Sequence, residues 1–153
     1  MKKLFTDQKA VRNLVLKSIE NLDTEALNKI PEGFNNNIVW NFAHILVTQQ
    51  LLVYKLSGLN PDIPKEWISK FRIGTKPEGL VSSQEITQIK DLFISIIEKT
   101  EQDYNQGIFK EFTPYTTSYN IALEKVEDSI NFNNVHEGVH LGYILAQCRL
   151  VKL

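Results

Sequence analysis

The chain contains three histidines, His44, His136 and His140, and their positions suggest a chemistry. His136 and His140 are four residues apart, so on a helix their side chains lie one turn apart on a single face. Two imidazoles in that arrangement can bind one metal ion. The pair alone is a modest signal, and a single histidine such as His44 on an apolar helix is more often a hydrogen-bonded core residue than a ligand.

The segment 136–140 also matches H-E-x-x-H, the zinc-binding helix of metalloproteases, in which the glutamate is the general base. The surrounding sequence does not fit. The longer protease pattern requires a glycine and a third histidine where this chain has Tyr143 and Ala146. Because no Asp, Glu or His follows His140, a further ligand must come from upstream. We therefore do not expect a protease, and His44 is the available third ligand.

The elements that carry these histidines are predicted to be helices. Proline divides the chain into long segments whose apolar residues recur every three or four positions, which is typical of helices. We expect helices over 7–22, 35–57 and 82–107, the first capped by Thr6 and the third opened by a Ser82–Glu85 capping box. A fourth helical segment is expected from about Thr117, broken between Asn131 and Asn134 and continuing over 135–151. No strand is expected.

These segments predict an all-α four-helix bundle formed by a single domain, residues 1–153. The connection 59–81 between the second and third helices is too long for a simple hairpin, and residues 65–71 are expected to form a short helical turn within it. On the second helix, His44 shares a narrow polar sector with Asn41, Thr48 and Lys55, and most of the other positions are apolar. We expect that helix to be covered on more than one side, by the bundle and by a second subunit. All three histidines can then converge where facing helices meet, which favours a metal site.

Composition and charge exclude several classes of function. A chain of 153 residues with 42% hydrophobic and 23% charged residues is typical of a globular domain. Its net charge of −1 gives no footprint for nucleic acid or for an anionic membrane surface. No apolar run approaches the roughly 18 residues of a membrane helix. A single cysteine, Cys148, and the absence of a signal-peptide pattern indicate a cytoplasmic protein.

Two motifs resemble those of the DinB/YfiT-like family of metal-dependent bundles. They are the segment Asn41-Phe42-Ala43-His44-Ile45 and the segment from His136 to Gly142. The similarity extends over essentially the whole chain, including the loop 74–77. It implies a four-helix bundle in which His44, His136 and His140 bind a divalent metal such as zinc or nickel, commonly in a homodimer. Members include thiol S-transferases that use low-molecular-weight thiols, and others are described as hydrolases. Tyr143 departs from the family pattern, because many members have Gln there.

Three protein ligands leave at least one coordination position open, which is typical of a catalytic site. Water bound there becomes a nucleophile near pH 7, or a thiol is held as its thiolate. The expected function is therefore a metal-dependent small-molecule enzyme, a thiol S-transferase or a hydrolase. The alternative is a non-enzymatic dimeric bundle in which the metal is structural, stress-related or absent.

Two further residues are candidates for a catalytic role. Tyr143 lies about one turn beyond His140 and could orient a ligand, or it is a half-buried bundle residue. Glu137 could act as a base or hydrogen bond to an imidazole, or it is only a charge suited to a helix N-terminus. Gly138 and Gly142 each cost about 1 kcal/mol within a helix, so we expect another group to approach the backbone there.

Overall fold

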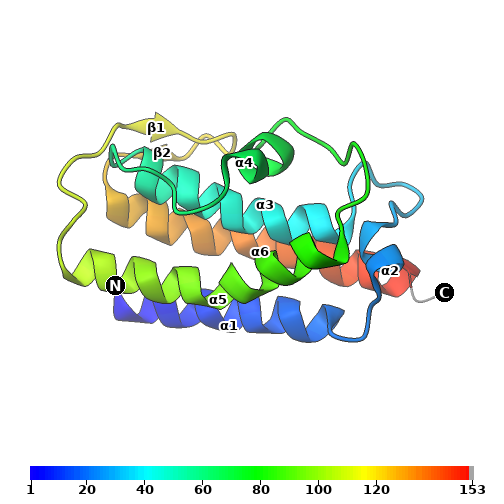
Figure 1. Cartoon of the computed structure of the whole chain (residues 1–153). Helices are drawn as coiled ribbons and strands as arrows, with labels where there is room; N and C mark the ends of the chain where they lie inside the picture. The colour runs from blue at the N-terminus through cyan, green and yellow to red at the C-terminus, as the bar shows by residue number, and fades with distance from the viewer. Residues whose placement is uncertain (152–153) are drawn as a thin grey trace.

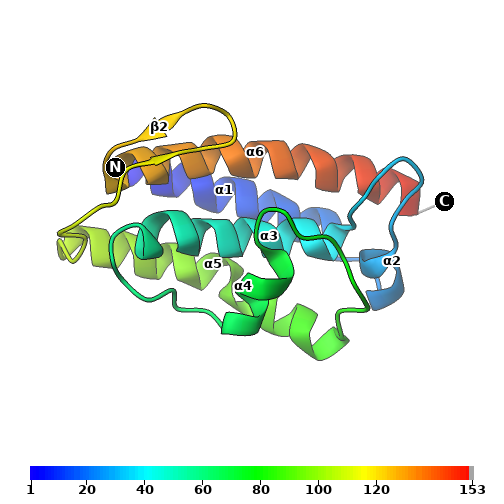
Figure 2. The same cartoon turned by 90° about the horizontal axis from the view of Figure 1, so that it is seen from above.

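The computed structural model describes residues 1–151, and four long helices form an antiparallel bundle (Figure 1). Helices α1 and α6 run in one direction, and α3 and α5 run in the other (Figure 2). The predicted all-α four-helix bundle is therefore confirmed. The long helices are α1 (Lys2–Ile19), α3 (Ile38–Gln50), α5 (Ser83–Asn105) and α6 (Val126–Val151).

The first helix begins earlier than predicted. Its N-cap is Met1, and Thr6 lies within the helix, where its hydroxyl donates a hydrogen bond to the carbonyl of Lys2. A threonine within a helix can form this i to i−4 bond, so its presence does not define a helix start. The short helix α2 (Thr24–Asn28) follows, and its N-cap Asp23 accepts a hydrogen bond from the Ala26 N–H.

Helix α3 carries His44 and ends in a π-helical turn. It begins where predicted, at Asn37, whose side chain accepts a hydrogen bond from the Trp40 N–H. From Leu51 to Lys55 the backbone forms the π-turn η1, which the sequence did not reveal. Gly58, with φ of 74°, then ends the segment in the left-handed conformation that glycine favours.

The long connection between α3 and α5 contains the short helix α4 (Lys65–Phe71), which confirms the predicted turn. The connection returns along the bundle, and α4 lies against α3 (Figures 1 and 2). Ser82 caps α5 by accepting a hydrogen bond from the Glu85 N–H. The Glu85 carboxylate pairs with Lys70 of α4 at 2.8 Å, so one half of the predicted capping box is present and the other half is a tertiary contact.

The C-terminal part differs from the prediction in two ways. Strands β1 (Tyr115–Thr116) and β2 (Ala122–Leu123) form a short antiparallel hairpin where a helix was expected. Two-residue strands are too short to show an alternating pattern, so the sequence gave no strand signal. Helix α6 is continuous through 131–134, and the predicted break is wrong. Tertiary contacts offset the weak helix propensity of asparagine there, because Asn134 donates a hydrogen bond to the Leu4 carbonyl.

Helix α3 is the centre of the core. Every residue from Ile38 to Val47 is buried, covered by α6, α5, α4 and the loops of the same chain. The apolar residues of this helix are therefore covered without a second subunit. The expectation that a second subunit covers part of this helix is wrong, so this helix gives no argument for a dimer. No helix within residues 1–151 is both long enough and apolar enough to cross a membrane.

On the opposite side of α6, a buried ion pair joins α6 to α1. Arg12 and Glu137 are both fully buried, with 2.8 Å between Arg12 Nη2 and Glu137 Oε1. Gln8 donates a second bond to Glu137 at 2.7 Å, and Arg12 also donates to the Phe93 carbonyl at 2.7 Å. Because each charge is paired and hydrogen-bonded, the cost of burying it is offset. This network fixes how α6 is rotated against α1.

We expect Arg12→Met to destabilise the protein by about 3–5 kcal/mol, because it leaves the Glu137 carboxylate buried without a counter-charge. The double variant Arg12→Met/Glu137→Met should lose less, since neither charge remains. Chemical denaturation measures both values. Lys3→Met, which removes a surface pair with Asp7, is the control and should change stability little. A double variant less stable than Arg12→Met would contradict this account.

Candidate metal centre

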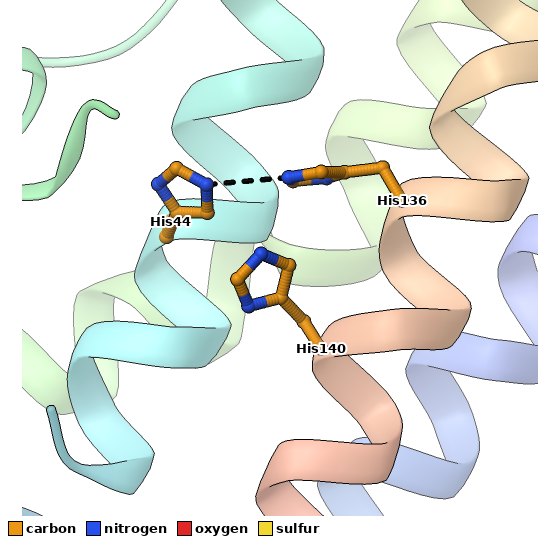
Figure 3. Close-up of side chains that lie close together, drawn as sticks. All are labelled: His44, His136 and His140. Carbon is orange, nitrogen blue, oxygen red and sulfur yellow. Dashed lines mark hydrogen bonds between the residues drawn. The ribbon is translucent and has the colours of Figure 1, made fainter. Parts of the chain in front are cut away.

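The three histidines converge from α3 and α6, as Figure 3 shows. Because α3 and α6 are antiparallel neighbours, His44 lies opposite the turn that carries His136 and His140. Each histidine offers one ring nitrogen, and these nitrogens all lie within 4.8 Å of one another. The prediction that distant parts of the chain bring three imidazoles together is confirmed.

The spacing fits a metal ion. The Nε2 atoms of His44 and His136 are 3.2 Å apart. Two imidazole nitrogens that bind one tetrahedral zinc ion at about 2.0–2.1 Å are about 3.3 Å apart. The ring centroids of His140 lie 4.7 Å from His44 and 4.5 Å from His136, so the third ring faces the same point.

His44 is held so that Nε2 is available as a ligand. Its Nδ1 lies 2.6 Å from the carbonyl oxygen of Phe71, the last residue of α4. A carbonyl only accepts hydrogen bonds, so Nδ1 carries the proton and the neutral ring keeps a lone pair on Nε2. The indole of Trp40 stacks on the same ring with 4.6 Å between centroids, and Trp40 Nε1 donates to Thr75 of the loop 74–77.

His140 is oriented by Asn41, one turn before His44 on α3. The Nδ1 atom of His140 lies 2.8 Å from Oδ1 of Asn41. The Asn41 amide nitrogen donates to the Asn37 carbonyl and lies within 3.2 Å of the Gln147 side-chain oxygen. Since that nitrogen has its own acceptors, Oδ1 is the atom that faces His140, and the imidazole proton is on Nδ1. The second ligand therefore also keeps a lone pair on Nε2. Metal-binding histidines usually donate their other N–H to such a partner.

His136 differs from the other two histidines. Its Nδ1 is buried and has no hydrogen-bond partner within residues 1–151. Its Nε2 faces the lone pair of His44, so without a cation between them Nε2 of His136 carries the proton and donates it. A bound cation would take the place of that proton. The donor set is three neutral imidazoles facing one point, and these residues fit a divalent metal.

Burial keeps all three rings neutral. Burial, with the nearby rings of His140 and His44, lowers the pKa of His136 to about 2. Burial, with His44 nearby, lowers the pKa of His140 to about 3. The pKa of His44 is also lowered by burial, although its bond to the Phe71 carbonyl acts in the opposite direction. At neutral pH the rings therefore carry no positive charge that would repel a cation, and only the proton on Nε2 of His136 has to move before that atom can bind one.

Glu137 does not lie among the histidines. Its buried carboxylate binds Arg12 and Gln8 of α1, and no hydrogen bond joins it to an imidazole within the described residues 1–151. It therefore belongs to the contact between α6 and α1, one position along the helix from His136.

Tyr143 lies at the edge of the site. Its ring is 48% exposed and packs edge-on against Phe34, with 6.3 Å between its centroid and that of His140. The structure places it beside the histidine cluster, on the solvent side. Gln147, one turn beyond Tyr143 on α6, is fully buried. Its side-chain oxygen accepts a hydrogen bond from Asn41, the residue that orients His140.

Sequence reasoning missed some of the groups that hold the site. Asn41 and Thr48 were identified as polar positions on the face of His44, three and four residues away. Their hydrogen bonds to the histidines were not predicted. The Thr48 hydroxyl lies 3.2 Å from Nε2 of His44. The Phe71 carbonyl could not have been found, because any residue offers a carbonyl and only the path of the chain brings this one to His44.

A cavity of about 240 Å³ reaches the cluster from one side. His44, His136 and Thr48 lie at one end, and the other walls come from η1, the β-hairpin and the loop after α4. A ligand in this cavity could contact two of the three histidines.

The chain belongs to the DinB superfamily, whose family model matches residues 9–144. The match covers most of the chain and includes all three histidines, which confirms the resemblance. A search of curated proteins finds no match.

We expect His136 and His140 of the metal-free protein to stay neutral between pH 8 and pH 5, and His44 to titrate below its ordinary pKa of 6.5. Their folded pKa values lie below the ordinary 6.5, so the stability that depends on neutral rings is complete above pH 6.5 and falls as the pH drops below it. NMR of the imidazole nitrogens should show the Nδ1–H tautomer for His44 and His140 and the Nε2–H tautomer for His136. Titration of any of the three near pH 6.5 in the folded protein would contradict the geometry.

Proposed function

We propose that this protein is a metal-dependent enzyme that acts on a small molecule, with His44, His136 and His140 as the metal ligands. One observation carries the proposal: the Nε2 atoms of His44 and His136 are 3.2 Å apart, and a ring nitrogen of His140 lies within 4.8 Å of both ligand atoms. Imidazole ligands suit zinc and nickel, and we propose one of these two ions.

The cavity favours a catalytic role over a structural one. Structural zinc sites are closed by four protein ligands, whereas catalytic sites keep a position for water or substrate. The cluster described within residues 1–151 has three ligands, and the cavity reaches two of them. An ion held there supplies Lewis acidity, which activates a bound water or thiol.

Two reaction classes fit this site: transfer of a group to a low-molecular-weight thiol, or hydrolysis. In both, the protein orients the histidines through Asn41 and the Phe71 carbonyl. Catalytic roles for Glu137 and Tyr143 stay predictions. The position of Glu137 favours a positioning role through α1, and that of Tyr143 favours contact with a ligand at the rim.

The test is the metal content of protein purified without a histidine tag. We expect about one zinc or nickel ion per chain in the wild type and a large loss in His140→Ala, since catalytic zinc sites need three protein ligands. Mass spectrometry of the metals measures both. Asn131→Ala, an exposed position on the same helix, is the matched control and should retain the metal. Equal or negligible metal in wild type and His140→Ala would refute the proposal.

Thermal melting with and without a chelator separates the enzyme from the non-enzymatic alternative. A structural metal stabilises the fold strongly, so its removal lowers the Tm by a large amount. For a catalytic metal we expect a small change in Tm together with loss of activity towards thiol or ester substrates.

We also propose a homodimer formed through the outer face of α6. Val135, Val139, Tyr143 and Leu150 are each between 40% and 50% exposed and lie along this face. Gly138 and Gly142 lie between them, and a Cβ atom at either would meet nothing within 4 Å, so no group within residues 1–151 makes the close approach that was expected. An apolar stripe of this kind is typical of an interface between subunits.

Light scattering at micromolar concentration should give the mass of a dimer, and Val139→Glu should give a monomer because it places a charge in the interface. Lys17→Glu, on the exposed part of α1, is the control and should remain dimeric. A monomeric wild type would contradict the proposed dimer and leave the metal site unaffected.

A further inference from the structure

The cavity beside the histidines has two chemically different ends. It extends along α3 and η1, from His44 at one end to Lys55, eleven residues later, at the other. Its volume of about 240 Å³ lies somewhat below the roughly 300–1,000 Å³ of pockets for drug-sized ligands, so it suits a smaller organic molecule. The lining residues are His44, Thr48, Leu51, Leu52, Lys55, Leu56, Ile73, Tyr115, Thr117, Ser118, Phe132 and His136.

The π-turn η1 forms much of this wall. A π-turn adds a residue to a helical turn, is rarely found, and occurs frequently at functional sites. Here it supplies Leu51, Leu52 and Lys55, and its closing hydrogen bond runs from the Leu56 N–H to the Leu51 carbonyl at 3.3 Å. Three of the residues that line the cavity therefore come from the π-helical turn that follows the helix carrying His44.

The middle of the cavity is apolar. Leu51, Leu52, Leu56, Ile73 and Phe132 form it, and hydroxyl groups of the β-hairpin lie along one side. Phe132 and Leu52 are at least nine-tenths buried and pack in one cluster with Leu123 of the hairpin. Such a surface favours an apolar body rather than a chain of charged groups.

Lys55 is the only lysine or arginine among the residues that line the cavity. No carboxylate lines the cavity. Ion pairs within residues 1–151 involve Lys3, Lys9, Arg12, Lys70 and Lys99, and Lys55 is in none of them. An ammonium group in this position attracts an anionic group of a ligand.

We propose that the cavity binds a small molecule that has an apolar body and a terminal carboxylate, and that Lys55 selects it by pairing with the carboxylate. The opposite end of the ligand then faces His44 and His136. This proposal names a substrate class for the enzyme. The statement that the end of the ligand near the histidines is the one that reacts rests on the function proposed above.

The test uses two probes that differ in charge, 4-phenylbutyrate and 4-phenylbutyramide, and the protein as purified. Isothermal titration calorimetry measures the Kd of each for wild type, Lys55→Met and Lys55→Arg. Lys55→Met keeps most of the apolar stem and removes the charge. Lys17→Met, the same change at an exposed position of α1, is the matched control.

We expect Lys55→Met to weaken binding of the acid about tenfold and to leave binding of the amide unchanged, as for loss of one partly exposed charge-assisted contact. Lys55→Arg should retain the preference for the acid. Added salt should weaken binding of the acid to the wild type and not to Lys55→Met, because salt screens the attraction between exposed charges.

Three results would overturn the proposal: no binding of either probe, equal loss for acid and amide, or an acid affinity independent of residue 55. The last result includes a carboxylate bound only by the metal. Circular dichroism melting of the Lys55 variants confirms that they are folded. All Lys55 variants keep the three histidines, and the comparison concerns the effect of residue 55 alone, so failure of the metal test and failure of this one are distinguishable.

Discussion

The opposed Nε2 atoms of His44 and His136, 3.2 Å apart in a buried setting, are the contact on which the site depends. Two imidazole lone pairs repel each other unless a proton or a cation lies between them. The Nδ1 proton of His44 is fixed by the Phe71 carbonyl, so His44 cannot supply a proton on Nε2 without becoming charged. Burial opposes that charge. Without a cation, Nε2 of His136 supplies the proton between the two rings. A divalent cation would take the place of that proton and bind all three rings together.

The bundle provides this contact through its topology. The connection between α3 and α5 returns along the whole bundle, and its helix α4 brings the Phe71 carbonyl to His44. On the other side of α6, the pair of Arg12 and Glu137 fixes the rotation of the helix that carries His136 and His140. The Phe71 carbonyl therefore fixes His44 on α3, and the buried pair of Arg12 and Glu137 fixes the helix that carries the other two histidines.

Much of this could be predicted from the sequence, because it depends on periodicity. The i, i+4 spacing of His136 and His140, the polar sector around His44 and the proline breaks predicted the bundle and the convergence of the three rings. The π-turn at Leu51–Lys55 could not be predicted, since π and α turns share the same apolar pattern. The uninterrupted α6 was missed because contacts such as that of Asn134 with Leu4 outweigh local propensity. The role of Glu137 was open because its partner Arg12 is 125 residues away in the chain.

X-ray absorption spectroscopy of the zinc-loaded protein tests the central claim most directly, because it reports the atoms around the ion. The account predicts three imidazole nitrogens at about 2.0–2.1 Å, with one or more non-protein ligands completing the shell. A first shell with fewer than three imidazoles, or one formed by carboxylate oxygens alone, would contradict it.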